Sequence, residues 1–335
     1  MSASVPIIDI DPLINDCGES QKAAAVASID GACRDWGFFQ VVNHGISDAL
    51  IDRVWEETHY FFALPRDVKL SVSRTRENPR GYYDRELTKN ARDLKEVFDF
   101  AALPFPDLPD DHPKNRAAVD GSNQWLDGLF DFKRTMLEYF SACELLGLQL
   151  LEGMCLALGM PGDALRGHFT PEHTSFVRLN YYPLDDPLEP AFAADVPTLG
   201  DMALHHHTDA GALTVLLQDD VGGLQVFANE GWYDIDPIER AIVVNVGDMM
   251  QVWSNDRFVA ALHRVRPIRD RARYSIPFFF NPSYDTDYAP LPSVAEDGPK
   301  YRTMNWGDFR RARTDGDFAD YGKEIQIEDF RIGPP

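Results

Sequence analysis

The stretch HHHTDAGALTV, residues 205–215, sets three histidines and an aspartate directly before an apolar, β-branched run. In an extended chain, side chains two residues apart point to the same face, so the His207 imidazole and the Asp209 carboxylate converge. An isolated H-x-D motif is weak, because a core histidine beside a turn aspartate gives the same letters. The stretch therefore predicts two ligands of one site, provided that a third ligand arrives from another strand.

The third ligand that the sequence offers is His263, in the run ALHRVR. Between it and Asp209 the chain has room for several strands to return to the same site. Two histidines and one carboxylate on one side of a metal leave the opposite side open, as in the non-heme Fe(II) oxygenases. His206 should face away from His207, and His205 shares its face but lies outside the motif, so we interpret both as bystanders.

Two further pairs with the same spacing occur in β-type runs. Arg273 and Ser275 form one pair, and Asn180 and Tyr182 form the other. A guanidinium suits a bidentate grip on a carboxylate, and the hydroxyl groups of Ser275 and Tyr182 can donate to the same anion. These four residues predict a receptor for a small carboxylic acid beside the metal.

The second half of the chain, residues 173–285, consists of short β-rich runs separated by turn residues. In order they are SFVRLNYYP, ALTVLLQ, LQVFA, WYDID, AIVVNV, FVAALHRVR and RYSIPFFFN. Runs that recur at intervals of about 8–12 residues favour an all-β sandwich or barrel. The predicted architecture is therefore mainly β, with a barrel core.

The first half of the chain predicts α-helices that brace this core. Strand patterns cover residues 5–10 and 36–46, and helical patterns cover 20–35, 48–63 and 122–159, the last as one long helix or two in tandem. Loop-like sequence covers 76–86, and a Pro/Asp-rich connector covers 103–115. A late helix is predicted at 300–313. We divide the chain into an N-terminal α/β region (1–120), bracing helices (121–172), the β core (173–285) and a C-terminal helix and tail (286–335), packed as one structural unit.

The composition, 44% hydrophobic and 26% charged over 335 residues, is that of an ordinary soluble globular protein. A net charge of −22 repels phosphate backbones and anionic lipids, so nucleic acids and membranes are not expected partners.

The four cysteines are scattered and should be free thiols in a reducing compartment. The first residues show no secretory signal pattern, and no apolar run approaches the ~18 residues of a membrane span. We expect a cytoplasmic protein, and a monomer by default.

Several longer stretches together resemble one enzyme family. They are HTDAGALTVLLQDDVGGLQV, NVGDMMQVWSN, HRV and RYSIPFF in the second half, and VPIIDIDPL and DWGFFQVVNHGI near the start. The chain resembles the Fe(II)/2-oxoglutarate-dependent dioxygenases, in the branch of isopenicillin N synthase, flavonoid and gibberellin oxidases and ACC oxidase. The resemblance covers most of the chain and implies a double-stranded β-helix, a jelly-roll, cupin-like core.

The resemblance also implies the roles of the site residues. His207, Asp209 and His263 would hold Fe(II), while Arg273 and Ser275 would bind the distal carboxylate of 2-oxoglutarate. Two more residues would assist, Tyr182 at that carboxylate and Asn180 at its border. The implied reaction consumes O₂ and 2-oxoglutarate, releases succinate and CO₂, and hydroxylates, desaturates or cyclises a small molecule, with ascorbate as a possible reductant. Beyond the metal ligands, no side chain is needed as a catalytic acid or base.

These motifs do not identify the substrate, but a few residues are candidates to contact it. Tyr82 and Tyr83, in the loop-like sequence PRGYYDRE, could cap the substrate cavity, and a surface aromatic pair is the alternative interpretation. Phe279 is a further candidate, in a run of three phenylalanines that suits core packing. His44 is interpreted as structural, and Gly222 begins a two-glycine turn.

Three other functions remain open from the sequence. One is an iron oxidase of the same branch that needs no 2-oxoglutarate, because isopenicillin N synthase and ACC oxidase keep the R-x-S pair. A second is a non-catalytic metal- or ligand-binding barrel that acts as a sensor or scaffold. A third is a Zn(II) hydrolase with a His₂Asp site, although it would give no reason for the anion receptor around Arg273.

Overall fold

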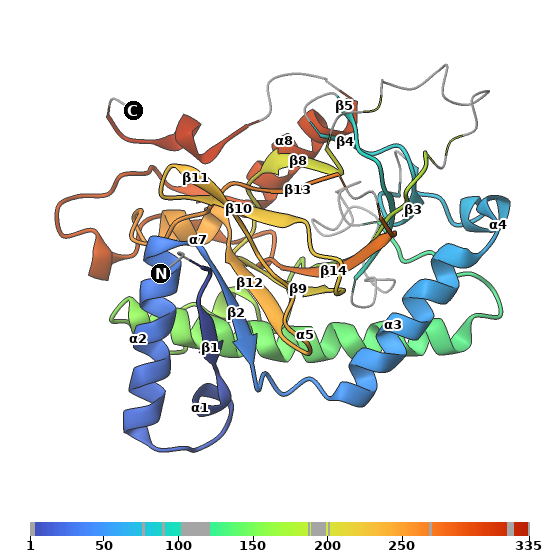
Figure 1. Ribbon diagram of the computed structural model, residues 1–335. Coiled ribbons are helices and arrows are strands. Elements are labelled where there is room, and N and C mark those ends of the chain that lie inside the picture. Colours follow the sequence, from blue (N-terminus) through green and yellow to red (C-terminus); the bar gives the residue numbers. More distant parts are fainter. Residues whose placement is uncertain are drawn as a thin grey trace.

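The computed structural model describes residues 4–75, 78–88, 91–101, 121–186, 188, 199, 202–267, 270–319 and 325–333. Two sheets dominate it (Figure 1). The larger sheet has eight strands in the order β1 (Ile7–Asp9), β2 (Phe38–Val42), β12 (Ile242–Val246), β9 (Leu213–Gln218), β14 (Arg273–Phe280), β7 (Phe176–Tyr182), β6 (Glu96–Ala101) and β3 (Gly81–Tyr83). The smaller has four, in the order β11 (Gly231–Asp234), β10 (Leu224–Ala228), β13 (His263–Val265) and β8 (Leu204–His207). The predicted double-stranded β-helix is confirmed, and the connector predicted at 103–115 lies outside the described residues.

Strands from the first half of the chain extend both edges of the large sheet. Its middle, β12-β9-β14-β7, comes from the predicted core and is antiparallel throughout. At one edge β2 pairs with β12, and β1 pairs with β2 in parallel. At the other edge β6 pairs with β7, and β3 pairs with β6. The N-terminal region is thus part of the same sheet as the barrel core.

The segment predicted as a loop at residues 76–86 is partly a strand, which corrects that prediction. Gly81–Tyr83 forms β3 and pairs with Val97–Asp99 of β6. The polar letters around the two tyrosines favour a loop locally, but pairing with a distant strand decides the conformation, as is common for β-structure.

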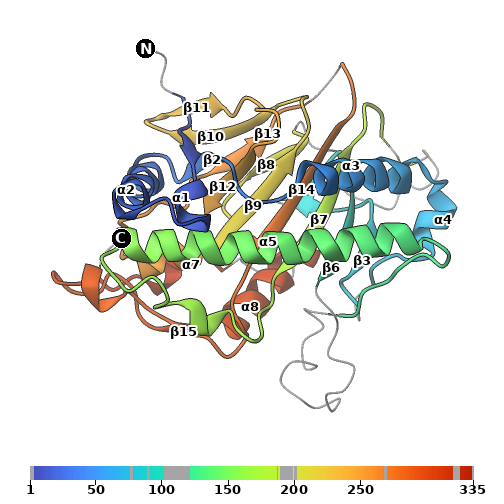
Figure 2. The same cartoon turned by 90° about the horizontal axis from the view of Figure 1, so that it is seen from below.

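The helices lie mainly on the outer face of the large sheet, where the main hydrophobic core sits (Figure 2). The α-helices are α1 (Asp11–Ile14), α2 (Glu19–Asp35), α3 (Asp48–Ala63), α4 (Arg66–Leu70), α5 (Phe130–Ala157), α7 (Asp248–Trp253) and α8 (Trp306–Ala319), with short 3₁₀ turns at Arg166–His168, Pro292–Val294 and Ile327–Phe330. The described residues also form two small two-stranded sheets, β4 (Leu87–Thr88) with β5 (Ala91–Arg92) and β15 (Asp287–Tyr288) with β16 (Met304–Asn305).

The long pattern predicted at 122–159 is one helix, α5, which runs across the sheet beneath α2 and α3 (Figure 2). Its 28 residues are long and apolar enough, by length and composition, to cross a membrane. However, its buried face packs on α2, α3 and β14, which identifies it as the core helix of this fold. Gly147 lets the Phe280 ring of β14 approach the helix, because a Cβ there would lie 3.1 Å from the ring.

Candidate active site

A cavity of about 430 Å³ lies between the two sheets. It is lined by side chains of β7, β9 and β14 from the large sheet and of β8, β10 and β13 from the small one, with α8 contributing at one side. A second, smaller hydrophobic cluster, which includes Phe38, Leu216 and Val226, surrounds part of it. The pairs Asn180–Tyr182 and Arg273–Ser275 both line this space as the i, i+2 spacing predicted. In β8, however, His206 lines it and His205 does not.

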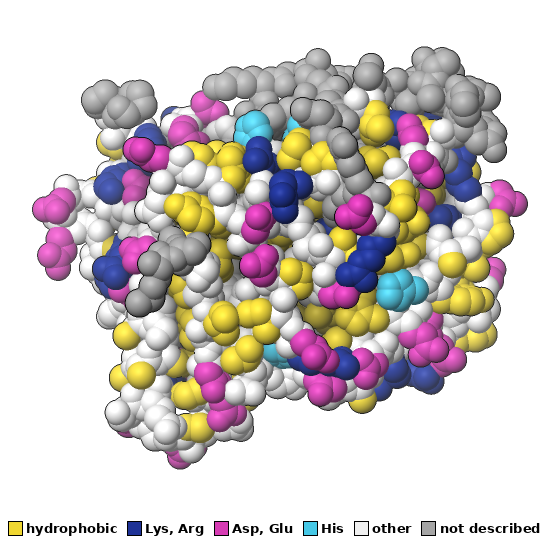
Figure 3. Space-filling model, viewed as in Figure 1, with side chains coloured by type: hydrophobic (Ala, Val, Ile, Leu, Met, Phe, Trp, Pro, Cys, Tyr) yellow, Lys and Arg dark blue, Asp and Glu magenta, His cyan; other side chains and the backbone are white. Residues whose placement is uncertain are grey.

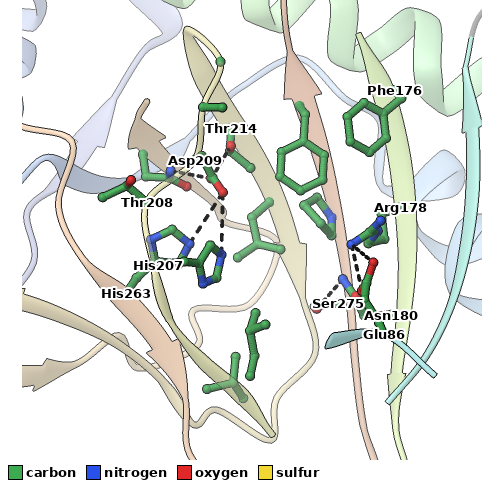
Figure 4. Close-up of a pocket in the computed structure, with 18 of the residues that line it drawn as sticks. Glu86, Phe176, Arg178, Asn180, His207, Thr208, Asp209, Thr214, His263 and Ser275 are labelled. Carbon is green, nitrogen blue, oxygen red and sulfur yellow. Dashed lines mark hydrogen bonds and ion pairs between the residues drawn. The ribbon is translucent and has the colours of Figure 1, made fainter. Parts of the chain in front are cut away.

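The three predicted metal ligands meet at one wall of the cavity. His207 ends β8 and lies directly opposite His263 of β13 in the strand register, and Asp209 follows two residues after His207. The Nε2 atoms of His207 and His263 lie 3.7 and 3.8 Å from Oδ1 of Asp209. One donor atom from each residue lies within 4.8 Å of the other two, and Figure 4 shows the three side chains pointing toward one another.

Hydrogen bonds orient all three donors. His207 Nδ1 is 2.8 Å from the carbonyl of His205, and His263 Nδ1 is 3.2 Å from the carbonyl of Ala261. Because a carbonyl only accepts, each Nδ1 carries the proton and each Nε2 presents its lone pair to the centre of the cluster. Such backbone contacts fix the tautomer and ring orientation of metal-binding histidines.

The carboxylate of Asp209 is held in the same way. Its Oδ2 accepts hydrogen bonds from Thr214 Oγ1 at 2.5 Å and Asn245 Nδ2 at 2.8 Å. Oδ1 is the oxygen that faces the two histidines. Neither Thr214 nor Asn245 was singled out from the sequence, although both sit on strand faces that alternate toward the cavity.

The charges of the cluster suit a divalent cation. Burial, reinforced by the neighbouring His263, lowers the pKa of His207 to about 3, so its imidazole is neutral at physiological pH. Burial alone would raise the pKa of Asp209, but the two histidines and the hydrogen bonds from Thr214 and Asn245 lower it, so the carboxylate is ionised. Two imidazoles and one carboxylate form a donor set that nitrogen- and oxygen-binding transition metals prefer.

The predicted anion receptor lies farther along the large sheet. Arg273 pairs with Tyr182 and Ser275 pairs with Asn180 across β14 and β7. The Asn180 Nδ2 is 3.4 Å from Ser275 Oγ, and the guanidinium carbon of Arg273 lies 5.0 Å from the centre of the Tyr182 ring. The structure therefore brings all four residues together.

The guanidinium of Arg273 is buried and only partly satisfied. It is 1% exposed, and its Nε donates to the carbonyl of Gly222 at 2.8 Å. Its Nη2 lies 3.4 Å from Gln218 Oε1, whereas Nη1 is buried and has no hydrogen-bond partner among the described residues. Because buried polar groups are nearly always hydrogen-bonded, this nitrogen points to a missing acceptor. Gly222, predicted as a turn residue, has φ of +80° and supplies the carbonyl that fixes the arginine.

The three residues predicted to contact the substrate lie in different positions relative to the cavity. Phe279 lines the cavity, and its ring stacks on Phe176 with centroids 4.6 Å apart. Tyr82 is fully buried on β3, and its hydroxyl donates to Glu96 at 2.6 Å. Neither Tyr82 nor Tyr83 is among the described residues that line the cavity. Pairing of β3 with β6 turns Tyr82 into the core and away from the cavity, whereas the capping role of Tyr83 stays a prediction.

Three further histidines discussed from the sequence, His205, His206 and His44, contact other parts of the protein. The His205 ring lies 3.1 Å from Asp93, while its carbonyl orients His207. His206 borders the cavity, is exposed and has its ring 6.5 Å from that of Trp232. His44 is buried, and its Nε2 lies 2.7 Å from the carbonyl of Arg240. His44 therefore has the structural position that was predicted for it.

A network of charged side chains at the far wall of the cavity was missed. Arg178, two residues before Asn180 on the inward face of β7, donates to both oxygens of Asp99 at 2.7 Å. It also lies 2.9 Å from Glu86, which accepts from Lys95 at 2.8 Å. Figure 4 shows Arg178 and Glu86 across the cavity from the histidines. The i, i+2 rule, continued one step from Asn180, would have placed Arg178 in the site.

The helix α8 reaches the loop that carries Asp209. Arg313 donates through Nη2 to the carbonyl of Thr208 and through Nη1 to Asp248, both at 3.2 Å. The backbone N–H of Asp248 in turn donates to the carbonyl of Asp209 at 2.7 Å. Burial raises the pKa of Asp248 to about 7, although the neighbouring Arg313 opposes this. The loop that carries Asp209 is thus held from a distant segment of the chain.

Two family models match this chain. Residues 5–128 match the model described as non-haem dioxygenase in morphine synthesis N-terminal, and residues 173–282 match the 2OG-Fe(II) oxygenase superfamily. The second match contains all three residues of the histidine–aspartate cluster and all four of the anion receptor.

Curated relatives and solved structures extend the similarity over nearly the whole chain. The chain is 34% identical to gibberellin 20 oxidase 1 of Arabidopsis thaliana, over 92% of this chain and 78% of that protein. It is 32% identical to a homoarginine-6-hydroxylase of Oryza sativa subsp. japonica, over 88% of this chain and 90% of that protein. The crystal structure of a full-length Neurospora crassa protein in complex with alpha-KG superposes with a TM-score of 0.77 at 28% identity, covering 92% of this chain and 95% of that one.

Proposed function

Because this chain belongs to the 2OG-Fe(II) oxygenase superfamily, we propose that His207, Asp209 and His263 bind its Fe(II) and that Arg273 and Ser275 bind its 2-oxoglutarate. The protein is an Fe(II)- and 2-oxoglutarate-dependent dioxygenase that oxidises a small molecule. The observation that carries the residue assignment is the convergence of three oriented donor atoms beside a buried guanidinium nitrogen that has no partner among the described residues.

The residues present fit both groups. The two Nε2 atoms and Asp209 Oδ1 converge from one side, so an ion held by them keeps open positions on its opposite side. A dianionic oxoacid would supply the acceptor that Arg273 Nη1 lacks, in a charge-assisted hydrogen bond. The charge of Fe(II), the oxoacid, Asp209 and Arg273 sums to zero, which lowers the cost of burying the cluster.

When bound, iron and 2-oxoglutarate together supply the activation of O₂, coupled to the conversion of the oxoacid to succinate and CO₂. The chain itself binds and orients. His207, Asp209 and His263 fix the position of the ion, while Arg273 and Ser275 fix the far carboxylate of the oxoacid, with Tyr182 beneath the guanidinium. Apolar side chains from both sheets exclude water from the reacting atoms. No protein side chain has to donate or accept a proton for this reaction.

The assignment of Arg273 is tested with O₂ uptake and succinate release, measured with and without 2-oxoglutarate. Arg273→Gln should raise the KM for 2-oxoglutarate about 100-fold, because a charged bidentate contact is lost from a buried site. Arg271→Gln is the matched control, since that side chain is 56% exposed and pairs with Asp220. An unchanged KM in the Arg273 variant would refute the assignment, and substrate turnover without succinate would refute the cosubstrate itself.

We also propose that the enzyme acts in the cytoplasm as a monomer. All four cysteines are free and three of them are buried, which suits a reducing compartment. Light scattering on the purified protein tests the oligomeric state, and a mass near 76 kDa rather than the chain mass of 37.8 kDa would refute it.

A further inference from the structure

Beyond the anion receptor, the inward faces of β7 and β14 end in a pair of stacked phenylalanine rings, here called the aromatic step. Two residues past Ser275 lies Pro277, and two past that lies Phe279, which stacks on Phe176 of β7. Figure 4 shows Phe176 on the same side of the cavity as Arg178, opposite the histidines. A molecule that fills the cavity between the histidine–aspartate cluster and this wall would therefore contact these two rings.

Two guanidinium groups from distant segments flank the aromatic step. Arg80 lies 5.2 Å from the centre of the Phe176 ring, and Arg310 of α8 lies 4.9 Å from it. Both line the cavity, and Arg80 is only 4% exposed. A guanidinium carries five N–H donors, so each can contact a substrate oxygen as well as a protein group.

The carboxylates at this end of the cavity are already bound to cations. Glu86 accepts from Lys95, Arg178 and, at 3.2 Å, Arg74. Asp99 accepts two hydrogen bonds from Arg178. Burial would raise the pKa of Glu86, but its three cations hold it well below the usual range. An ammonium or guanidinium group on a substrate would have to compete with these buried ion pairs.

The described part of the cavity wall beyond the cofactor residues has a net charge opposite in sign to that of the chain as a whole. The net charge is −22, and acidic and basic side chains are interspersed on the face in Figure 3. The described cavity wall beyond the cofactor residues instead has six cations, namely Arg74, Arg80, Lys95, Arg178, Arg310 and Arg313, against two anions, Glu86 and Asp99. Two of the six, Arg80 before β3 and Arg310 on α8, lie 5.2 and 4.9 Å from the centre of the Phe176 ring.

We propose that the substrate is a small organic acid, whose apolar body lies against Phe176 and Phe279 and whose carboxylate is bound by Arg80 and Arg310. This rests on the proposed function, because it places the carbon to be oxidised at the open side of the metal. Arginine is the side chain best suited to bind a carboxylate through paired hydrogen bonds. A cationic side chain, such as that of the amino acid named in the hydroxylase from Oryza sativa, is not the group that this wall fits.

The first experiment uses the wild-type enzyme with Fe(II), 2-oxoglutarate and O₂. Succinate release is measured for a panel of metabolites in matched sets: acid, primary amide, amine and phosphate monoester on the same carbon skeleton. The expected result is that acids raise succinate release and that their amides have KM values at least about 10-fold higher. A panel in which amines, neutral compounds or phosphate esters score and no acid does would overturn the proposal.

The second experiment uses the best acid of that panel and variants of α8. Arg310→Gln should raise the KM for the acid about 10-fold, with a smaller change in kcat, and leave the KM for its amide unchanged. Arg310→Lys should restore part of the loss, because the charge remains. Arg311→Gln is the matched control, on the same helix with a side chain 53% exposed. Equal KM values in the two glutamine variants would overturn the proposal.

Failure of the proposed substrate class can be distinguished from failure of the proposed function. If Arg310→Gln does not fold, Arg80→Gln is measured in its place, with Arg85→Gln, whose side chain is 38% exposed, as its control. If some compound raises 2-oxoglutarate-dependent succinate release but no acid does, the proposed function stands and the substrate class is wrong. If no compound and no condition gives succinate, the proposed function fails first.

Discussion

The two ends of the cavity are built in different ways. At the metal end, short side chains on paired strands are held by backbone carbonyls two residues away, as for His207 and His263. At the opposite end, long charged side chains from β6, β7 and the segment around Glu86 hold one another. The orientation of each histidine is therefore set by its own short segment of chain, whereas every contact of the charged end depends on distant segments meeting correctly.

This difference has a functional reading. Backbone hydrogen bonds to a histidine depend little on which residues surround it, so the metal end can stay the same while the rest of the chain changes. Salt-bridge networks are specific to their members, since removal of one partner leaves another charge buried. The end that would contact substrate is thus the end where single substitutions alter both shape and charge.

The largest effect is expected at the metal end. Asp209→Ala removes the only carboxylate of the cluster and should abolish Fe(II) binding and turnover, because two neutral imidazoles alone hold the ion poorly. Anaerobic titration with Fe(II) measures the binding directly. Asp220→Ala, whose side chain is 79% exposed, should bind Fe(II) like the wild type. If Asp209→Ala still bound Fe(II) tightly, the two ends of the cavity would be assigned wrongly.

The next effect is on stability, at the charged end. Glu86→Gln leaves Lys95, Arg178 and Arg74 with less buried counter-charge and should lower the free energy of unfolding by about 3 kcal/mol at pH 7. Urea denaturation measures it. Glu138→Gln, which removes an exposed pair with Arg53, should cost less than about 1 kcal/mol.

The loss in Glu86→Gln should also depend on pH, with a definite sign. The pKa of Glu86 is depressed in the folded protein below the ordinary value of 4.5. Its contribution is therefore complete above pH 4.5 and is lost as the pH falls through the folded-state pKa. The difference between wild type and variant should shrink in denaturation curves recorded below pH 4.5. A difference that grew with acid would contradict the ion-pair assignment.

The smallest effect concerns orientation rather than charge. Thr214→Val removes the hydroxyl that donates to Asp209 Oδ2 and should weaken Fe(II) binding about 10-fold, as for other outer contacts of metal ligands. Thr58→Val is the control, because that buried hydroxyl has no hydrogen-bond partner among the described residues. Equal Fe(II) affinities in both variants would show that Asn245 alone orients the carboxylate.

The features that could be predicted from the sequence are mainly those that depend on local patterns. The i, i+2 spacing was sufficient to bring His207 to Asp209 and Arg273 to Ser275, because strand alternation is a local property. His263 came from chemistry, as the remaining histidine in a β-type run. The roles of these residues in binding iron and 2-oxoglutarate stay predictions until the variants are measured, as do the residue boundaries drawn between the regions.

What could not be predicted depends on strand pairing across the chain. The contact of Arg178 with Asp99 requires that β6 lie beside β7, and no local pattern around residues 96–101 indicates this neighbour. Tyr82 was misplaced for the same reason, since its burial follows from the pairing of β3 with β6. The long helix α5 was predictable, because a 3.6-residue apolar period over many turns is strong and local.

The inward side chains of β7 and β14 also set the length of the cavity, because they are regularly spaced along the two strands. Alternate residues are about 6.8 Å apart along a strand. The inward residues run from Tyr182 and Arg273, at the proposed 2-oxoglutarate site, to Phe176 and Phe279 at the far end. Exchanging side chains at the far steps changes the length and polarity of the molecule that fits, without shifting the register that positions the near ones. A lineage, or a protein engineer, can therefore retarget this scaffold to new metabolites while the reaction itself is conserved.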